Sequence, residues 1–304
     1  MLQKIPYLLA GDRVALAAPA RAVSHEEMAP AINTLTAWGL EVVVPDGLYE
    51  RQGQLAGSDE HRTELLQGLL DDPSIGAIFC ARGGYGTVRI VDKLDFKGFA
   101  KHPKWIVGYS DATVLHSHVQ ATLGLPTMHA TMPINFPADS KPCAATDSLR
   151  QTLFGRPTDI VWERHRLDRQ GVAEGVVVGG NLSILYSLLG SRSQIDTRGK
   201  ILLIEDLDEY LYHIDRMMQA LRRAGMLDGL AGLVVGGLTE MHDNTIPWGH
   251  TAEEIVMEAV GDKGYPVAFG APIGHIGTAN RALPLGMKAR MTINETKTIS
   301  ITTP

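Results

Sequence analysis

The chain has few of the residues that mark disulfide-rich, metal-binding or membrane proteins. Its 304 residues include two cysteines, Cys80 and Cys143, too few for a disulfide framework or a cysteine-based zinc set. Cys80 ends an apolar run and is expected to be buried as a small hydrophobic residue. No uninterrupted apolar stretch approaches the roughly 20 residues that a membrane-spanning helix needs. We therefore expect no metal, no membrane and a reducing, cytoplasmic location.

Neither sign of charge is in large excess over the other. The net charge of -6 comes from dispersed acidic and basic residues without a basic stripe, which argues against nucleic acid as a partner. Residues 1–22 have an apolar tint but a poor positively charged start, so we expect no secretion signal there. Apolar residues make up 44% of the chain, enough for a substantial core. A soluble globular protein that acts on a small molecule is expected.

Short apolar strands alternate with helices in the first half of the chain. The expected strands are 14–18, 42–44, 75–80 and 104–107, and the expected helices are 24–38, 59–70 and 111–123. This alternation predicts a parallel sheet covered on both faces, with ligands at the carboxyl ends of its strands. The fold class is therefore α/β, with an N-terminal domain over 1–135.

A proline-rich, weakly patterned segment over 136–170 predicts a linker, within which only 145–154 resembles a helix. Beyond it we expect a C-terminal domain over 171–304. Its expected strands are 172–178, 201–204, 232–235, 267–269, 287–293 and 298–302, and its expected helices are 182–189 and 210–224. The chain is thus expected to fold as two α/β units joined by a linker.

The tetrad Gly108-Tyr109-Ser110-Asp111 joins a predicted strand to a predicted helix. The pattern Gly108-x-Ser110-x-Ala112 is close to the Gly-x-Ser-x-Gly nucleophile elbow, in which small flanking residues allow a sharp turn that exposes the hydroxyl. The alternative, which a short serine motif alone favours, is that Ser110 caps a helix beginning at Asp111. Ser110 is therefore a candidate nucleophile whose support must come from elsewhere in the chain.

A glycine-rich turn, Arg-Gly-Gly-Tyr-Gly at 82–86, follows another predicted strand. Its glycines leave the backbone bare, so that N–H groups can approach a ligand oxygen closely. In an acyl-transfer reaction, the N–H groups of Gly84 and Asp111 would form an oxyanion hole. There are two alternatives. The turn could bind phosphate, but the glycine patterns typical of nucleotide sites are incomplete, or it could be purely structural.

A general base must come from one of eleven histidines. His116 and His118 lie two residues apart in a predicted helix, so they point in different directions and are expected to be packing or surface residues. His275 follows a short predicted strand in a loop, where functional residues are often placed. Glu205 ends the apolar run 201–204, a suitable place for a carboxylate that orients an imidazole.

Together these motifs resemble the LD-carboxypeptidase family of serine peptidases, which includes murein tetrapeptide carboxypeptidases and microcin C immunity peptidases. The resemblance spans nearly the whole chain and rests on the order of segments 17–19, 82–86, 108–113, 179–182, 203–206, 274–275 and 283–286. It implies that Ser110 is the nucleophile, Glu205 the triad acid and His275 the base, with oxyanion donors at Gly84 and Asp111. It also implies an N-terminal parallel-sheet α/β domain, a C-terminal mixed, barrel-like α/β domain and an active site between them.

The resemblance implies a serine LD-carboxypeptidase that removes C-terminal D-alanine from murein tetrapeptides in peptidoglycan recycling. It further implies a homodimer and an acyl-enzyme mechanism without metal or cofactor. Arg82 is the first candidate for binding the substrate carboxylate, ahead of Arg281, because an arginine fork can donate two hydrogen bonds. Arg82 is equally suited to bracing the glycine turn. Gly83, Tyr85 and Asn181 are expected to line the substrate site.

Three other functions stay open. An immunity-type peptidase would hydrolyse acylated aminoacyl-adenylates, but the resemblance then implies an extra aromatic loop, and the chain is compact between 195 and 205. An α/β-hydrolase-type esterase would share the order of serine, acid and histidine. A non-catalytic binding protein would use Ser110 and Gly84 only to hydrogen-bond a ligand. The murein peptidase is the favoured interpretation.

Overall fold

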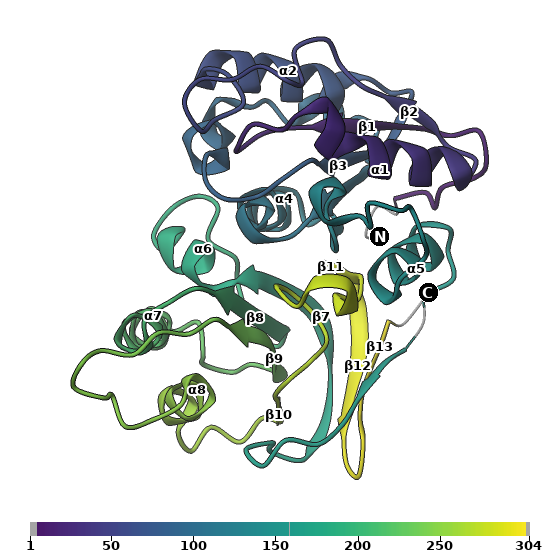
Figure 1. Ribbon diagram of the computed structural model, residues 1–304. Helices are drawn as coiled ribbons and strands as arrows, with labels where there is room; N and C mark the ends of the chain where they lie inside the picture. Colours follow the sequence, from purple (N-terminus) through teal and green to yellow (C-terminus); the bar gives the residue numbers. More distant parts are fainter. Residues whose placement is uncertain (1–4, 158, 302–304) are drawn as a thin grey trace.

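The computed structural model describes residues 5–157 and 159–301 and contains two β-sheets with helices packed against them (Figure 1). The first sheet has the spatial order β11 (Leu283–Leu285), β5 (Thr127–His129), β4 (Trp105–Gly108), β3 (Ile75–Cys80), β1 (Arg13–Ala17) and β2 (Glu41–Val43). Neighbouring strands pair in parallel except for β11, which is antiparallel to β5. The predicted α/β class is confirmed.

Both faces of the first sheet are buried, because successive residues of a strand point to opposite sides. Val14 and Leu16 of β1 pack in one core, and Ala15 and Ala17 pack in the other. Residues of α1 (His25–Ala37) and α5 (Ala144–Leu153) complete the first core. Residues of α2 (Asp59–Asp71), α3 (Lys97–Lys101) and α4 (Thr113–Leu123) complete the second.

The second sheet has seven strands and is mixed. Its order is β10 (Val267–Ala268), β9 (Gly232–Thr239), β8 (Ile201–Leu207), β7 (Gly171–Asn181), β12 (Lys288–Ile293), β13 (Lys297–Ile301) and β6 (Ile160–Trp162). Pairing is parallel from β10 to β7 and antiparallel from β7 to β6. The described strands form an open series, so the expected barrel-like form is not confirmed. Residue 302 of the predicted strand 298–302 lies outside the described residues.

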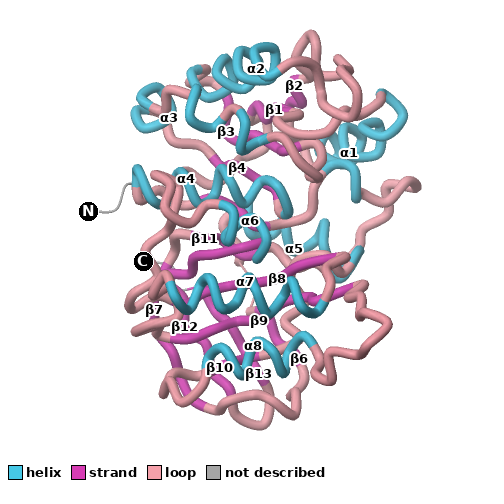
Figure 2. Tube along the Cα trace, turned by 90° about the vertical axis from the view of Figure 1, so that its left-hand side faces the viewer, coloured by secondary structure: helices cyan, strands magenta, loops and turns pink. Residues whose placement is uncertain are grey.

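Helices α6 (Leu182–Ser187), α7 (Leu211–Arg223) and α8 (Ala252–Val260) pack against this second sheet (Figure 2). Buried side chains of α7 recur every three to four residues, which gives the helix one apolar stripe: Ile214, Met217, Met218 and Leu221. Within residues 5–157 and 159–301, no helix is both long and apolar enough to cross a lipid bilayer.

Several segments connect the two sheets. Segment 136–170, expected as a linker, contains α5, which packs in a core of the first sheet, and β6, which belongs to the second. Strand β11 comes late in the chain and joins the first sheet. The division into 1–135, 136–170 and 171–304 stays a prediction.

The carboxyl end of β7 meets the start of α4. The backbone N–H of Asn181 donates to the Thr113 hydroxyl at 3.0 Å. A Cβ added to Gly180 would lie 2.6 Å from the same hydroxyl oxygen, so the approach of the two chains requires glycine. Glu205 of β8 lies beside Asn181 in the sheet register. This contact brings the strand ends of the second sheet next to the turn that carries Ser110.

Candidate active site

Ser110 lies on the turn between β4 and α4. Its φ of 60° is rare for a residue other than glycine, and such strain, on the order of 1–3 kcal/mol, gathers at functional sites. A Cβ added to Gly108 would lie 2.8 Å from the Ala112 Cβ, so the turn requires small residues. Helix α4 begins at Thr113 with Ala112 as its N-cap residue, so Ser110 does not cap that helix. The structure thus favours the elbow over the cap.

The glycine turn at 82–86 lies directly against this serine. A Cβ added to Gly83 would lie 2.9 Å from both the Cβ and the Oγ of Ser110. Gly84 has a φ of 101°, a conformation that residues other than glycine rarely adopt. Its N–H donates to no backbone carbonyl of the described residues. Tyr85 is 48% exposed at the tip of the turn. Bare backbone therefore adjoins the hydroxyl, as an oxyanion site requires.

Asp111 ties the start of the serine turn to the segment after the glycines. Its side chain is buried, and Oδ2 accepts the backbone N–H of Thr87 at 2.9 Å. Burial raises the pKa of Asp111, although hydrogen bonds from Thr87 oppose the rise. The Asp111 side chain therefore holds the two turns together. The oxyanion donor expected at this residue is its backbone N–H.

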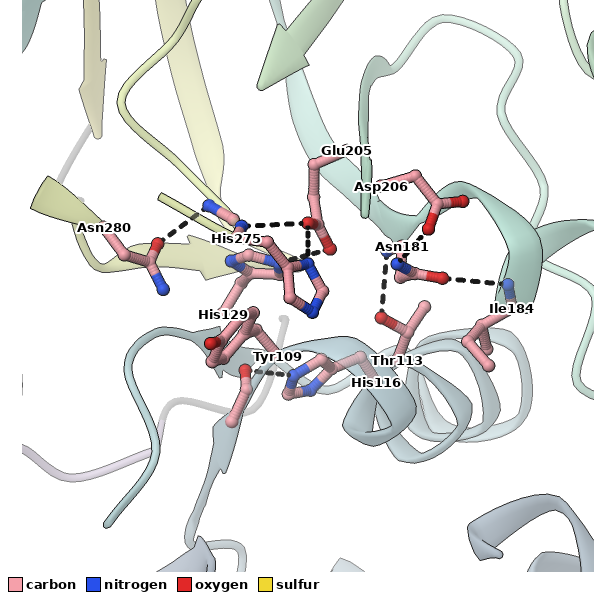
Figure 3. Close-up of polar contacts among 12 residues, drawn as sticks. Tyr109, Thr113, His116, His129, Asn181, Ile184, Glu205, Asp206, His275 and Asn280 are labelled. Atoms are coloured by element: carbon pink, nitrogen blue, oxygen red, sulfur yellow. Dashed lines mark hydrogen bonds and ion pairs between the residues drawn. The ribbon is translucent and has the colours of Figure 1, made fainter. Parts of the chain in front are cut away.

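Buried Glu205 and partly buried His275 form a hydrogen-bonded pair (Figure 3). His275 Nδ1 lies 2.7 Å from Glu205 Oε2, and the His275 backbone N–H donates to the same oxygen at 3.2 Å. A Cβ on Gly274 would collide with this carboxylate, so only glycine lets the loop approach it. Asn280 Oδ1 accepts the Gly274 N–H at 2.9 Å and fixes the loop from its other side. The sequence-predicted acid and base are therefore brought together.

The pKa values of Glu205 and His275 are shifted in the directions that favour His275 as a general base. Burial alone would raise the pKa of Glu205, but the nearby His129 imidazole and the hydrogen bond to His275 outweigh it and lower the pKa to about 2. Burial also disfavours a charged His275, but the hydrogen bond and the charge of Glu205 prevail and raise the His275 pKa above its ordinary value. An ionised carboxylate thus supports a histidine that readily accepts a proton.

The His275 ring also lies against the nucleophile turn. Its centroid is 4.7 Å from that of Tyr109, the residue before Ser110, and Figure 3 shows it between Glu205 and Tyr109. The Tyr109 hydroxyl donates to Asn135 Oδ1 at 3.1 Å, and burial raises the Tyr109 pKa to about 12. Tyr109 is therefore a neutral, anchored surface on which the histidine ring rests.

Asn181 is only 4% exposed, and its side chain is hydrogen-bonded within the protein. Its Nδ2 donates to Asp206 Oδ1 at 2.9 Å, and its Oδ1 accepts the Ile184 N–H at 3.2 Å as the N-cap of α6. These bonds position the strand end that meets Thr113. A substrate contact by Asn181 stays a prediction.

Arg82 and Arg21 are among the arginines at the glycine turn. Arg82 Nη1 lies 3.3 Å from Glu27 Oε1, and about a third of each side chain is exposed. The Arg21 side chain crosses Gly84, because a Cβ on that glycine would collide with Arg21 Cδ. Arg21 was not predicted from the sequence, although it lies two residues beyond segment 17–19. Arg281, the second candidate, donates to the Ala144 carbonyl at 3.3 Å.

Three histidines of α4 and β5 are buried. His116 Nε2 lies 2.9 Å from the Gly108 carbonyl, and burial lowers its pKa to about 3, so it is a neutral packing residue. His118 is also buried, as expected for a packing residue. His129, at the end of β5, was not predicted; its Nε2 lies 3.7 Å from Glu205 Oε1. The available signal was a histidine directly after Thr127 and Met128, at the end of a short strand.

The cysteines take no part in the pair. Cys80 is fully buried, as predicted, and burial raises its pKa to about 12. Cys143 is partly buried at the start of α5. In the part of the chain that the structure describes, no group of three or more His, Cys, Asp or Glu side chains is arranged to hold a metal ion.

Comparison with known proteins identifies relatives along most of the chain. The model of the LD-carboxypeptidase N-terminal domain matches residues 14–130, and the model of the LD-carboxypeptidase C-terminal domain matches residues 174–291. A probable murein peptide carboxypeptidase of Bacillus subtilis (strain 168) is 36% identical over 292 residues, which cover 94% of this chain and 90% of that protein.

Solved structures show the same architecture. The crystal structure of muramoyltetrapeptide carboxypeptidase from Oxalobacter formigenes matches with a TM-score of 0.87 and 26% identity, over 96% of this chain and 99% of that one. The microcin C7 self immunity protein MccF in complex with aspartyl sulfamoyl adenosine matches with a TM-score of 0.86 over 98% of both chains. At 21% identity, this second likeness shows the fold alone.

Proposed function

This chain belongs to the LD-carboxypeptidase family of serine peptidases, and from that premise we propose that it removes C-terminal D-alanine from murein tetrapeptides. The observation that carries the proposal is the Glu205–His275 pair, joined at 2.7 Å and packed against the residue before Ser110. The names of the Bacillus relative and the Oxalobacter structure support a murein peptide as substrate.

In the proposed first half-reaction, His275 Nε2 takes the proton of the Ser110 hydroxyl as Oγ attacks the carbonyl carbon of the substrate's L-centre. The N–H groups of Gly84 and Asp111 stabilise the oxyanion, and each such donor typically contributes about 3 kcal/mol. His275 then protonates the departing amine. The peptide C–N bond breaks, D-alanine leaves and the tripeptide stays esterified to Ser110.

The second half-reaction reverses these proton transfers. Water gives a proton to His275 and attacks the ester carbonyl, and the same two backbone donors stabilise the second oxyanion. His275 returns the proton to the Ser110 oxygen as the C–O bond breaks, which releases the tripeptide. Glu205 stays ionised throughout, keeping the Nδ1 proton on His275 and stabilising the imidazolium in each transition state.

The substrate carboxylate would be bound at the glycine turn. We propose Arg82 for this role, with Gly83, Tyr85 and Asn181 lining the site, as the family resemblance implies. The ion pair of Arg82 with Glu27 has a single contact at 3.3 Å, which a second carboxylate can join or replace. Arg21, lying across Gly84, adds a further positive charge at this edge.

The wider setting is also part of the proposal. A murein tetrapeptide carboxypeptidase of this kind would act in peptidoglycan recycling in the cytoplasm, as a homodimer. A C-terminal domain of barrel-like form, following the N-terminal parallel-sheet domain, completes the proposed architecture. Light scattering tests the oligomeric state, because a dimer has twice the 32.9 kDa mass of the chain.

A panel of substrates tests the proposed function. We expect release of D-alanine from the tetrapeptide, about 100-fold or more faster than release of L-alanine from its diastereomer. Hydrolysis of simple acyl esters without this stereochemical preference would favour an esterase. Faster hydrolysis of an acylated aminoacyl-adenylate would favour the immunity-type activity, which is supported by the similarity in fold to MccF alone. Binding without turnover would contradict an enzyme of either kind.

A further inference from the structure

We propose that His129 is a positioning residue of this active site, which holds the Oε1 oxygen of Glu205 so that Oε2 faces His275. This inference rests on the proposed function, because it assigns His129 a part in the Ser110, His275 and Glu205 machinery. It concerns a side chain that reaches the triad acid from the opposite sheet.

The topology places His129 beside both parts of the site. His129 closes β5 and lies opposite Gly108, the last residue of β4 before the nucleophile turn. Its Nε2 lies 3.7 Å from Glu205 Oε1, and neither side chain is exposed to solvent. Glu205 belongs to β8 of the second sheet, so the contact spans the two sheets (Figure 3).

The polar atoms at this contact have no other partners. Glu205 Oε2 accepts both His275 bonds, whereas Oε1 accepts no hydrogen bond from the described residues. Neither ring nitrogen of His129 has a hydrogen-bond partner in that part of the chain. Buried donors and acceptors are almost always paired in folded proteins. His129 Nε2 and Glu205 Oε1, both without another partner and 3.7 Å apart, are therefore suited to pair with each other. A small movement of either side chain would close the hydrogen bond.

The surroundings leave this role to His129. Its ring lies 6.0 Å from that of Tyr109 and 6.4 Å from that of His116, measured between centroids, and burial keeps His116 uncharged by lowering its pKa. The other ionisable groups that act on the site are negative or belong to the pair itself: Asp206, Glu240, Glu205 and His275. No other described group donates to Oε1.

Loss of this donor has two consequences that a packing role would not have. The Glu205 carboxylate would be held by His275 alone, so its orientation would loosen and the positioning of the base would suffer. The carboxylate would also become more basic, because a hydrogen bond to the charged form is lost. A more basic partner stabilises the protonated form of His275, so the pKa of His275 would rise.

The first test compares His129→Leu with His129→Gln in steady-state hydrolysis of the tetrapeptide. The leucine variant removes the donor, and kcat should fall about tenfold or more while KM changes less than about threefold. The glutamine amide places a donor near Nε2 and should restore kcat to within about threefold of the wild type. Should the leucine variant not fold, His129→Met carries the same test with a side chain that adapts to irregular space.

His118→Leu is the matched control. His118 is also buried, its Nδ1 lies 2.8 Å from the Ser193 hydroxyl, and its ring packs against Phe96. We expect His118→Leu to lose thermal stability, because it breaks a buried hydrogen bond. Neither kcat nor the pH dependence of kcat should change. Equal effects of the two leucine variants on kcat would overturn the positioning role.

The second test needs no substrate. Ring carbons of labelled histidines report the protonation of His275 by NMR, and in His129→Leu its midpoint should rise by about half a pH unit or more. His118→Leu should leave it unchanged. A shifted midpoint without D-alanine release by the wild type would contradict the proposed function and leave the positioning role standing. D-alanine release with an unshifted midpoint and unchanged kcat in folded His129→Leu would overturn the positioning role alone.

Discussion

The Nδ1 atom of His275 lies 2.7 Å from Oε2 of Glu205, although 70 residues separate the two in the chain. The carboxylate is completely buried in the carboxyl-terminal half of β8, and the histidine comes from a loop that approaches it at a glycine. Such a pair fixes one imidazole tautomer and stabilises its protonated form. A pair of this kind can activate a neighbouring serine hydroxyl.

Glu205→Gln should abolish most of the activity. The amide keeps the shape of the side chain but removes the charge that stabilises the imidazolium, so we expect kcat for D-alanine release to fall by about a thousandfold or more. Asp208→Asn is the control, because Asp208 is an exposed acid three residues along the chain. A Glu205→Gln variant within tenfold of the wild type would argue against a triad.

The pH profile should show a raised acid limb. His275 must be neutral to accept the serine proton, and the hydrogen bond and charge of Glu205 raise its pKa despite burial. Activity should therefore fall as the pH drops through a value above the ordinary histidine pKa of about 6.5. Measurement of kcat/KM from pH 5 to pH 9 gives this value. An acid limb at or below 6.5 contradicts the expected effect of Glu205.

Gly83→Ala should impair the nucleophile. The new methyl group would lie 2.9 Å from the Ser110 Cβ and Oγ, so the hydroxyl must move from its place beside the glycine turn. We expect kcat to fall about 100-fold, since a displacement of about 1 Å has this effect in other sites. Gly68→Ala, where a Cβ meets nothing within 4 Å on helix α2, should keep full activity. Equal activity of both variants would place the reaction elsewhere.

Arg82→Met should weaken binding of the substrate's terminal carboxylate. A hydrogen bond to a charged group contributes about 1.5–3 kcal/mol, so KM should rise about tenfold or more. The same variant should treat a C-terminal amide analogue as the wild type does. Arg290→Met, which removes an arginine paired with Glu174 on the second sheet, is the control. If Arg21→Met alone raises KM, Arg21 holds the carboxylate and Arg82 braces the turn.

Elements with a strong local pattern were predicted well from the sequence. The expected strand 75–80 is β3, and the expected helix 210–224 is α7 within one residue at each end. Their apolar residues recur at the period of the element, so burial and local conformation favour the same structure. The order of motifs that one family shares predicts the pairing of Glu205 with His275, whose side chains lie 2.7 Å apart.

Contacts that depend on the assembled fold were not predicted. Strand β11 joins the first sheet although its three residues lie far from the others in sequence, and no local period marks such a pairing. His129 and Arg21 come near the site only because β5 and the glycine turn are packed beside it. Segment 136–170 looks irregular because its helix and strand are short and serve different sheets.

Release of D-alanine from a murein tetrapeptide by the wild type and by Ser110→Ala is the most direct test of the account. We expect the wild type to release D-alanine and the tripeptide in equal amounts, and the alanine variant to lose about a thousandfold or more of that rate while it folds normally. Undiminished release by Ser110→Ala, or none by the wild type with either lysine or diaminopimelate at the scissile position, would contradict it.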